Sequence, residues 1–323
     1  MGGFAPDRGG PLVIVGDVVT DVVCRTIGPW RIGTDTPASI EIRPGGSAAN
    51  TSAWAAWSHR RERSQRLTVP TDPGGVVLIG RVGPDDARWH CDALREHGVD
   101  AQLVVDTAAV TTRLVALIDD VNGERTMLTD RGAGLLLEPH ELDEAVFAAA
   151  GWVHLSGYLL FADAPRRSFL QITRWCAAHG VSWSVDPASS GFLTDLGVET
   201  ARALLTGASI GFPNSDEALV LAGLGPDGNV EAAAASLCSL WETVVVTCGA
   251  AGALVARGGE IIERMGAKEL VVVLDAVGAG DAFAAAWIVA HRHGFDSAQC
   301  LQRATDTALV ALGVTGGRPA SNS

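Results

Sequence analysis

A glycine-containing turn followed by an acidic residue lies near the end of the chain, in the segment LVVVLDAVGAGDAFAAAWI (residues 270–288). The pattern predicts a strand over 270–275, a tight turn, and a helix that begins near Asp281. Gly278 and Gly280 remove side chains where the turn brings backbone N–H groups close to a ligand, and the helix directs its positive end to the same point. The segment therefore predicts an anion hole beside a carboxylate.

Asp281 has two interpretations. As a general base, it would accept a proton from an attacking hydroxyl while the turn stabilises a transferring phosphoryl group. Alternatively, its carboxylate only caps the helix that follows, which is a common role for Asp at a helix start. A GAGD turn by itself leaves both roles open.

Further segments occur in order along the chain and carry a family resemblance. They are RPGGSAANTSAWAAW (43–57), LIGRVGPDD (78–86), GERT (123–126), PNSDE (213–217) and VVVTCGAAGALV (244–255), followed by the GAGD turn. Together they make the sequence similar to the ribokinase-like (PfkB) carbohydrate kinase family over roughly residues 11 to 318. The resemblance implies an ATP-dependent kinase that phosphorylates a hydroxyl of a small sugar or sugar acid. It assigns the catalytic base to Asp281 and the anion hole to Gly278, Ala279 and Gly280.

The resemblance also implies a nucleotide site. Asn214 and Glu217 match the family's Asn-x-x-Glu element, which helps hold hydrated Mg²⁺ near the phosphates, and their oxygens suit that ion. A capping box at the start of the helix over 215–224 explains the same pair, and both roles can hold at once. Thr247, Gly249 and Gly252 resemble the strand and turn whose backbone faces the ATP phosphates.

The residues that resemble the family's substrate pocket lie in the first fifty positions. Asp21 falls where relatives place an acid that grips substrate hydroxyls, and Asp17 is a weaker candidate for the same role. Gly45, Gly46 and Asn50 fall beside the same pocket.

Two departures from the family pattern affect the substrate and the cations. Ribokinases usually have Asn two positions before the substrate Asp, whereas this chain has Val19, which disfavours ribose. Ala276 and Val277 replace the hydroxyl-rich pair common before GAGD. Because Asp275 is present, we still expect that a monovalent cation (K⁺) can bind beside this turn.

Continuous apolar runs rich in Val and Ile alternate with Ala-rich helical stretches. Such runs predict strands covered on both faces, and the alternation predicts a mainly parallel central sheet between two helical layers, the α/β, three-layer ribokinase-like fold. The predicted strands are 11–16, 76–80, 152–157, 181–186, 208–214, 243–247 and 270–275, and the predicted helices are 47–57, 88–98, 215–224, 230–241 and 281–294.

Two segments, 22–43 and 112–130, do not follow this alternation of strands and helices. The second reads as two strands around Asn122-Gly123, a dipeptide that suits a hairpin turn. We expect both segments to form one small β-sheet, a lid over the substrate pocket. The resemblance implies that such a lid excludes water and pairs two chains into a homodimer. We therefore divide the chain into a tail (1–10), one kinase domain (11–318) and a second tail (319–323).

Charge and composition narrow the partners. The formal net charge is −13, so the molecular field repels nucleic acid and anionic membranes, and we expect neither as a partner. A phosphorylated small molecule remains compatible, because backbone dipoles bind phosphate inside an acidic protein. MGGFAPDRGG lacks the charged and apolar regions of a secretion signal, and no later window is apolar over the length of a membrane span. We expect a cytoplasmic protein.

Other motifs in the sequence favour other functions less well. GLGPDG (223–228) has the spacing of a dinucleotide fingerprint but follows a predicted helix, and no Walker-type GxxxxGK[ST] occurs. His291 and His293 indicate a solvated helix end rather than a zinc site. A nucleoside kinase of the same fold would need an aromatic base-stacking pocket, for which Trp30 is a candidate. The third hypothesis is a catalytically silent binding protein.

Overall fold

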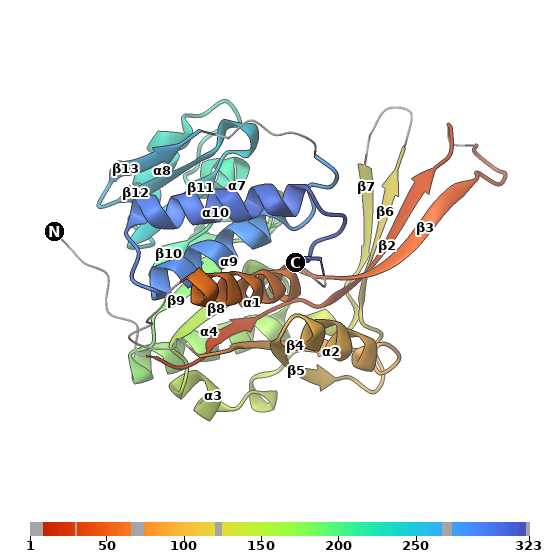
Figure 1. Cartoon of the computed structure of the whole chain (residues 1–323), viewed down its shortest axis with the longest axis horizontal. Helices are drawn as coiled ribbons and strands as arrows, with labels where there is room; N and C mark the ends of the chain where they lie inside the picture. Colours follow the sequence, from red (N-terminus) through yellow and green to blue (C-terminus); the bar gives the residue numbers. More distant parts are fainter. Residues whose placement is uncertain (1–8, 30, 66–73, 120–124, 267–272, 321–323) are drawn as a thin grey trace.

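Two β-sheets organise the part of the chain that this computed structural model describes, residues 9–29, 31–65, 74–119, 125–266 and 273–320 (Figure 1). The large sheet has nine strands in the order β13-β12-β11-β10-β9-β8-β1-β4-β5, and the small sheet has four in the order β3-β2-β6-β7. The strands of the large sheet are β1 Leu12–Val15, β4 Val76–Val82, β5 Val99–Val105, β8 Trp152–Ser156, β9 Trp183–Asp186, β10 Ile210–Gly211, β11 Thr243–Thr247, β12 Ala253–Arg257 and β13 Glu260–Met265. All pairs from β5 to β11 are parallel, and β12 and β13 continue antiparallel.

Strand β1 shows why the large sheet carries helices on both faces. Its four residues, LVIV, are all buried, and successive side chains of a strand point to opposite faces. Leu12 and Ile14 belong to one hydrophobic core, whereas Val13 and Val15 belong to a second. A strand with apolar residues on both faces is stable only between two apolar layers, so the run of Val and Ile dictates a three-layer α/β fold.

The helices divide between these two cores (Figure 1). One core is covered by α1 Ser47–Gln65, α2 Ala87–Glu96, α9 Ala279–Arg292 and α10 Ser297–Leu312. The other is covered by α3 Glu144–Ala148, α4 Asp163–His179, α5 Ser190–Leu196, α6 Val198–Leu205, α7 Ser215–Leu221 and α8 Val230–Leu237. The predicted α/β architecture is confirmed. None of the helices described is long and apolar enough to cross a membrane.

The two segments that break the βα rhythm form the small sheet, as expected. Its strands are β2 Val19–Thr26, β3 Ala38–Gly45, β6 Thr112–Ile118 and β7 Arg125–Asp130. Strands β2 and β6 pair in parallel, while β3 and β7 add antiparallel edges. The small sheet projects away from the large one, at the right of Figure 1. The predicted turn at Asn122-Gly123 lies outside the described residues.

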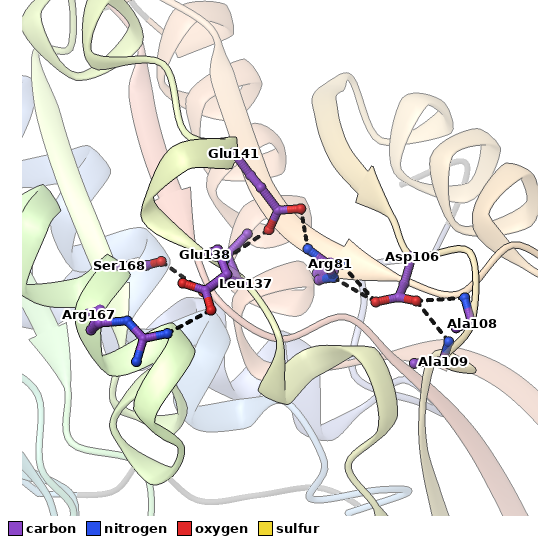
Figure 2. Close-up of polar contacts among 9 residues, drawn as sticks. All are labelled: Arg81, Asp106, Ala108, Ala109, Leu137, Glu138, Glu141, Arg167 and Ser168. Carbon is purple, nitrogen blue, oxygen red and sulfur yellow. Dashed lines mark hydrogen bonds and ion pairs between the residues drawn. The ribbon is translucent and has the colours of Figure 1, made fainter.

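The connection from β5 to β6 is held by a partly buried ion-pair network (Figure 2). Arg81 of β4 donates to Asp106 Oδ2 through Nε and Nη2, at 3.1 and 2.7 Å, and also pairs with Glu141. The other carboxylate oxygen of Asp106 accepts from the backbone N–H groups of Ala108 and Ala109, at 2.7 and 2.8 Å. These hydrogen bonds lower the pKa of Asp106 to about 2, and the two from backbone N–H groups have the largest effect. The connection therefore starts from a fixed point on the large sheet.

Two sequence predictions are wrong in detail. Residues 273–275 form no strand, and Val273 and Leu274 are 52% and 57% exposed, so they are not a covered central strand; 270–272 lie outside the described residues. Beyond β11, the large sheet ends in the antiparallel pair β12 and β13. His291 does not mark a solvated helix end, because it is buried and packs edge-on against Trp152 with ring centroids 5.1 Å apart.

Candidate active site

Asp281 lies in the first turn of α9, where this helix meets the start of α1. Ser47 Oγ donates a hydrogen bond to its Oδ1 at 2.7 Å, and Asn50 Nδ2 donates to its Oδ2 at 3.0 Å. The cap position of α9 is Gly278, and no side chain caps it. Both carboxylate oxygens therefore contact α1, and the alternative that Asp281 is the N-cap of its own helix is wrong.

Burial raises the pKa of Asp281 to about 7, although the hydrogen bonds from Ser47 and Asn50 act in the opposite direction. The nearby carboxylates of Asp186 and Asp17 raise it further. A carboxyl group with a pKa near neutrality is a suitable general base, because about half of it is ionised near pH 7 and the ionised form accepts a proton readily.

Glycines allow three chain segments to meet beside Asp281. Gly278 has φ +79°, and a Cβ there would lie 2.4 Å from the carbonyl oxygen of Gly317. A Cβ on Gly317 would in turn lie 2.3 Å from Asn50 Nδ2. Gly280 differs, since a Cβ there would meet nothing within 4 Å. Gly278 and Gly317 are thus required for packing, whereas Gly280 leaves space beside the start of α9.

A cavity of about 280 Å³ lies in front of Asp281, at the carboxyl ends of the parallel strands, where α/β proteins commonly bind ligands. It brings together predicted residues from distant parts of the sequence, namely Asn214, Glu217, Thr247, Gly280 and Asp281. Its other lining residues include Ser47, Tyr158, Asp186, Ala188, Phe212 and Phe283. The cavity therefore brings together members of the predicted catalytic, nucleotide and metal sets. It does not include the other predicted members of these sets among its lining residues, namely Gly278, Ala279, Gly249, Gly252 and Asp275.

Asn214 and Glu217 form a capping box at the start of α7. Asn214 Oδ1 accepts from the backbone N–H of Glu217 at 3.0 Å, and Glu217 Oε2 accepts from the backbone N–H of Asn214 at 2.9 Å. Burial and then the Asp186 charge raise the pKa of Glu217 to about 9. The capping-box interpretation is confirmed. No group of three or more His, Cys, Asp or Glu side chains capable of holding a metal occurs among the described residues.

The turn after β11 carries the residues that the sequence assigns to the nucleotide. Thr247 pairs with Asn214 in a parallel bridge, and Ser215 Oγ donates to the Thr247 carbonyl at 3.3 Å. Gly249 and Gly252 have φ of +53° and +96°, values that favour glycine over other residues. The turn thus keeps its shape only with these glycines, directly beside the cavity.

Asp17 and Gly46 lie at the start of α1. Asp17 Oδ2 accepts from the backbone N–H of Ser47 at 2.9 Å, and its Oδ1 accepts from Ser156 Oγ at 3.1 Å. Gly46 has φ +98°, and a Cβ there would lie 2.6 Å from the Asp17 carbonyl oxygen. Asp17 therefore stabilises the helix end that carries Ser47 and Asn50 to Asp281.

Asp21 and Gly45 face each other across β2 and β3. A Cβ on Gly45 would lie 2.1 Å from Asp21 Oδ2, so only glycine leaves room for this carboxylate. Burial, and secondly the charge of Asp17, raise the pKa of Asp21 to about 7, against the opposing effects of Arg318 and Arg43. Asn50 also lies near these residues and packs against Gly317. Its Oδ1 is buried and has no hydrogen-bond partner in the described structure.

Asp275, the predicted cation ligand, is held by backbone groups. Its Oδ1 accepts from the N–H of Val277 at 3.1 Å, its Oδ2 accepts from the N–H of Gly316 at 3.2 Å, and Arg43 Nη1 lies 3.9 Å from Oδ2. The carboxylate thereby joins the GAGD turn to the segment that carries Gly317.

Sequence reasoning missed Ser47, which donates to Asp281, and three further residues around the site. Asp186 ends β9 at the cavity, and its Oδ1 accepts from the N–H of Ala188, which has φ +85°. Its position at the end of the run VSWSVD was the signal that could have found it. Tyr158 stacks under Arg131, and the run WVHLSG stops just before it. Arg318 is buried and donates to the Gly45 carbonyl at 3.2 Å, and no local pattern predicts it.

Comparisons with known proteins identify the family of the chain. The chain matches the pfkB family of carbohydrate kinases over residues 11–323. It is 27% identical to an adenosine kinase of Dictyostelium discoideum, over 81% of this chain and 77% of the relative, and 29% identical to a fructokinase of Klebsiella pneumoniae, over 85% and 82%.

A solved structure of the Arabidopsis thaliana ribokinase complexed with ribose and ATP shares the fold, with a TM-score of 0.77 and 22% identity over 98% of this chain and 97% of that one. These proteins are thus named as kinases of different small molecules. The chain belongs to the pfkB family of carbohydrate kinases, and is a phosphotransferase with an alcohol group as acceptor.

Proposed function

We propose that this enzyme transfers the γ-phosphoryl group of ATP to a hydroxyl of a small sugar or sugar acid, with Asp281 as catalytic base. The observation that carries the proposal is the placement of Asp281: partly buried, with a pKa of about 7, at the start of α9 and in one cavity with Asn214, Glu217 and Thr247. A base and a phosphate-binding edge lie on the same cavity, as in-line phosphoryl transfer requires.

The start of α9 supports a role as anion hole. Gly278 holds the cap position without any side-chain cap, so the first N–H groups of the helix remain open to a ligand. A transferring phosphoryl group develops charge on its oxygens, and backbone N–H groups together with the helix dipole stabilise that charge. Gly280 leaves the space beside these groups clear.

Asn214, Glu217 and Asp186 fit a hydrated Mg²⁺ ion. Mg²⁺ keeps several waters and needs only one or two protein carboxylates besides phosphate oxygens, so a full cage of acidic side chains is unnecessary. All three residues line the cavity that contains Asp281. When bound there, the ion neutralises charge on the β- and γ-phosphates. Thr247, Gly249 and Gly252 would hold the nucleotide on the adjoining turn, and Asp275 is the candidate for K⁺.

Asp21 and Asn50 are the proposed contacts to substrate hydroxyls. Asp21 is a partly buried carboxylate for which Gly45 leaves room. Asn50 Oδ1 is a buried acceptor without a partner in the described structure, which a donor hydroxyl would satisfy. Gly45, Gly46 and Asp17 shape the wall around them. The small sheet, as a lid, would exclude the water that competes with the acceptor hydroxyl.

A nucleoside is the second candidate substrate, because an aromatic cluster lies beside the cavity. Tyr158, which lines the cavity, has its ring centroid 5.9 Å from that of Phe192, and Phe161 lies 4.3 Å from Phe192. Arg131 covers both Tyr158 and Phe192. A purine base would stack on such a surface. Trp30, the base-stacking residue considered from the sequence, lies outside the described residues.

The small sheet also supports a homodimer. Val22, Cys24, Ile40, Ile42, Val115, Leu117 and Leu128 are neighbours in register on one face, which we call the apolar lid face. Ile40 and Ile42 are each 64% exposed. A contiguous exposed apolar face of this kind marks an interaction site, and a second copy of the same sheet is its proposed partner.

A substrate panel tests the function. Thermal-shift measurements with a non-hydrolysable ATP analogue and Mg²⁺, followed by a coupled ADP assay, would compare D-fructose, D-ribose, 2-dehydro-3-deoxygluconate and adenosine. We expect turnover with at least one sugar or sugar acid. Turnover with adenosine alone would favour the nucleoside kinase. Absence of any ATP turnover across an extended panel would overturn the proposal and favour a silent binding protein.

A further inference from the structure

The carboxylate of Asp86, just after β4, makes an unusual pair of contacts. It occupies the cap position of α2, yet it makes no side-chain cap bond to its own helix. Its Oδ2 instead accepts a hydrogen bond from Thr20 Oγ at 2.7 Å, and its Oδ1 accepts one from Thr111 Oγ. An Asp at a helix start ordinarily satisfies the helix N–H groups, so this diversion needs another explanation.

The two threonines belong to the two strands that enter the small sheet from the large one. Thr20 is the second residue of β2, and Thr111 directly precedes β6. These strands run side by side in parallel, with Val19 opposite Thr112. One carboxylate therefore binds both strands at the point where they leave the large sheet.

The contacts around Asp86 are buried and mutually consistent. Thr20 and Thr111 are buried, and His90, fully buried, places Nε2 2.9 Å from Thr20 Oγ. Because the Thr20 hydroxyl donates its one proton to Asp86, His90 must donate from Nε2, which leaves Nδ1 unprotonated in the neutral ring. Burial lowers the pKa of His90 to about 4, and Nδ1 indeed has no hydrogen-bond partner in the described structure.

Thr111 is fixed from a second side. The backbone N–H of Gly83 donates to Thr111 Oγ at 2.8 Å, and a Cβ on Gly83 would lie 2.5 Å from the Thr111 nitrogen. Together with Arg81 and Asp106 (Figure 2), these contacts fix both ends of the connection into β6.

Asp21 follows Thr20 in β2, and successive side chains of a strand point to opposite faces. When the hydroxyl of Thr20 is held by Asp86, the carboxylate of Asp21 is held on the other face, against Gly45. We propose that Asp86 is a positioning residue, which clamps β2 and β6 so that Asp21 is presented to the phosphoryl acceptor. The role given to Asp21 in this inference rests on the proposed function. The clamping of β2 and β6 by Asp86 does not depend on that function.

The test replaces Asp86 by Asn, which remains a good helix cap and has nearly the same shape, but has one acceptor oxygen where the carboxylate has two. Asp92→Asn is the matched control, because Asp92 lies in the same helix and pairs only with exposed Arg88 and Arg95 in the described structure. Thermal melting establishes that each variant is folded.

The first measurement needs no substrate. Hydrogen–deuterium exchange of the wild type, Asp86→Asn and Asp92→Asn should show amides of residues 19–24 and 112–117 exchanging about tenfold faster in Asp86→Asn alone, because local opening of the clamp exposes them. Unchanged exchange in both segments would overturn the clamp. This result is independent of whether the enzyme phosphorylates any member of the substrate panel.

The second measurement separates positioning from mere stability. With whichever of D-fructose, D-ribose, 2-dehydro-3-deoxygluconate or adenosine the wild type phosphorylates, Asp86→Asn should raise the acceptor KM about tenfold or more while leaving the KM for ATP unchanged. Thr20→Val should do the same, and the double variant should be no worse than either single one, because both remove one interaction. Equal increases in both KM values, or additive effects, would refute the positioning role.

Discussion

Asn50 Nδ2 donates a hydrogen bond of 3.0 Å to Asp281 Oδ2, so a residue expected in the substrate pocket directly contacts the expected catalytic base. The two lie 231 positions apart in the chain, on α1 and α9. Both helices pack on the same face of the large sheet and point their starts at one place. The contact orients the carboxylate, while burial keeps its pKa near neutrality.

Replacing Asp281 by Asn tests the base directly. Asn retains the shape and one of the two acceptor oxygens that contact α1, but it does not accept a proton, so kcat should fall by a factor of about 10² to 10⁴. Nucleotide affinity, measured by titration with the ATP analogue, should remain near the wild-type value. Asp195→Asn, a change at an exposed acidic position, is the control. Near-normal turnover of Asp281→Asn would show that another group takes the proton.

The pH dependence of turnover follows from the same residue. Because the pKa of Asp281 is raised to about 7 and the ionised form is the active base, kcat should rise with pH and level off above about 7. The free energy of unfolding should change with pH in the opposite direction. Asp21, Asp186, Glu217 and Asp281 all have raised pKa values, so their protonated forms favour the folded state.

These four groups therefore contribute their full stabilising free energy to the ligand-free protein below their ordinary pKa near 4. This contribution is lost as the pH rises through their folded-state pKa values of about 7 to 9. Melting temperatures between pH 5 and 9 would check this trend, and Asp281→Asn should show a smaller decline. A melting temperature that rises throughout this interval would contradict the buried, protonated state of the cluster.

Local sequence patterns predicted the elements whose causes are local. The Val- and Ile-rich runs gave β1, β4 and β8 within a few residues, since burial on both faces leaves a continuous apolar signature. The run before GAGD has the same composition, yet residues 273–275 form no strand. Apolarity alone does not reveal which runs pair within the sheet, because strand order is a long-range property.

The site was predictable where family motifs or strand ends mark it, as for Asp281 and Asn214. Arg318 carries no such mark, since its position beside Asp21 depends on how the chain end folds back onto β3. The contact of Asp86 with two strands is hidden for the same reason: Thr20 is 66 positions away from it. A sequence window shows an Asp at a helix start and predicts a cap.

Metal dependence tests the roles of Asn214 and Glu217. Activity should require Mg²⁺ or Mn²⁺ and disappear in excess EDTA, since the phosphate charge must be neutralised for transfer. Glu217→Gln should raise the Mg²⁺ concentration needed for half-maximal rate while its capping bonds still form. Full activity in EDTA would refute the mechanism. K⁺ stimulation is expected to be weak, because Ala276 and Val277 supply no hydroxyls and Arg43 lies 3.9 Å from Asp275.

Asp21→Ala tests the substrate contact. A hydrogen bond to a charged group contributes roughly 1.5 to 3 kcal/mol, so acceptor binding should weaken by that amount while ATP binding barely changes. Calorimetric titration of each ligand into the folded variant measures both. Gly45→Ala is a companion variant, because its methyl group would displace the Asp21 carboxylate and produce the same selective loss. Equal losses for acceptor and ATP would refute the assignment.

The apolar lid face should determine the oligomeric state. Ile42 lies on that face and Glu41, its neighbour in β3, on the opposite one, so Ile42→Asp and Glu41→Gln form a matched pair. Light scattering after gel filtration should show a dimer for the wild type and Glu41→Gln, and a monomer for Ile42→Asp, because burying an unpaired carboxylate in an apolar interface is costly. If the dimer keeps each lid closed, Ile42→Asp should also hydrolyse ATP faster without acceptor, as water enters the site. A wild-type monomer at the highest concentration measured, or a dimer that survives Ile42→Asp, would show that this face has another partner.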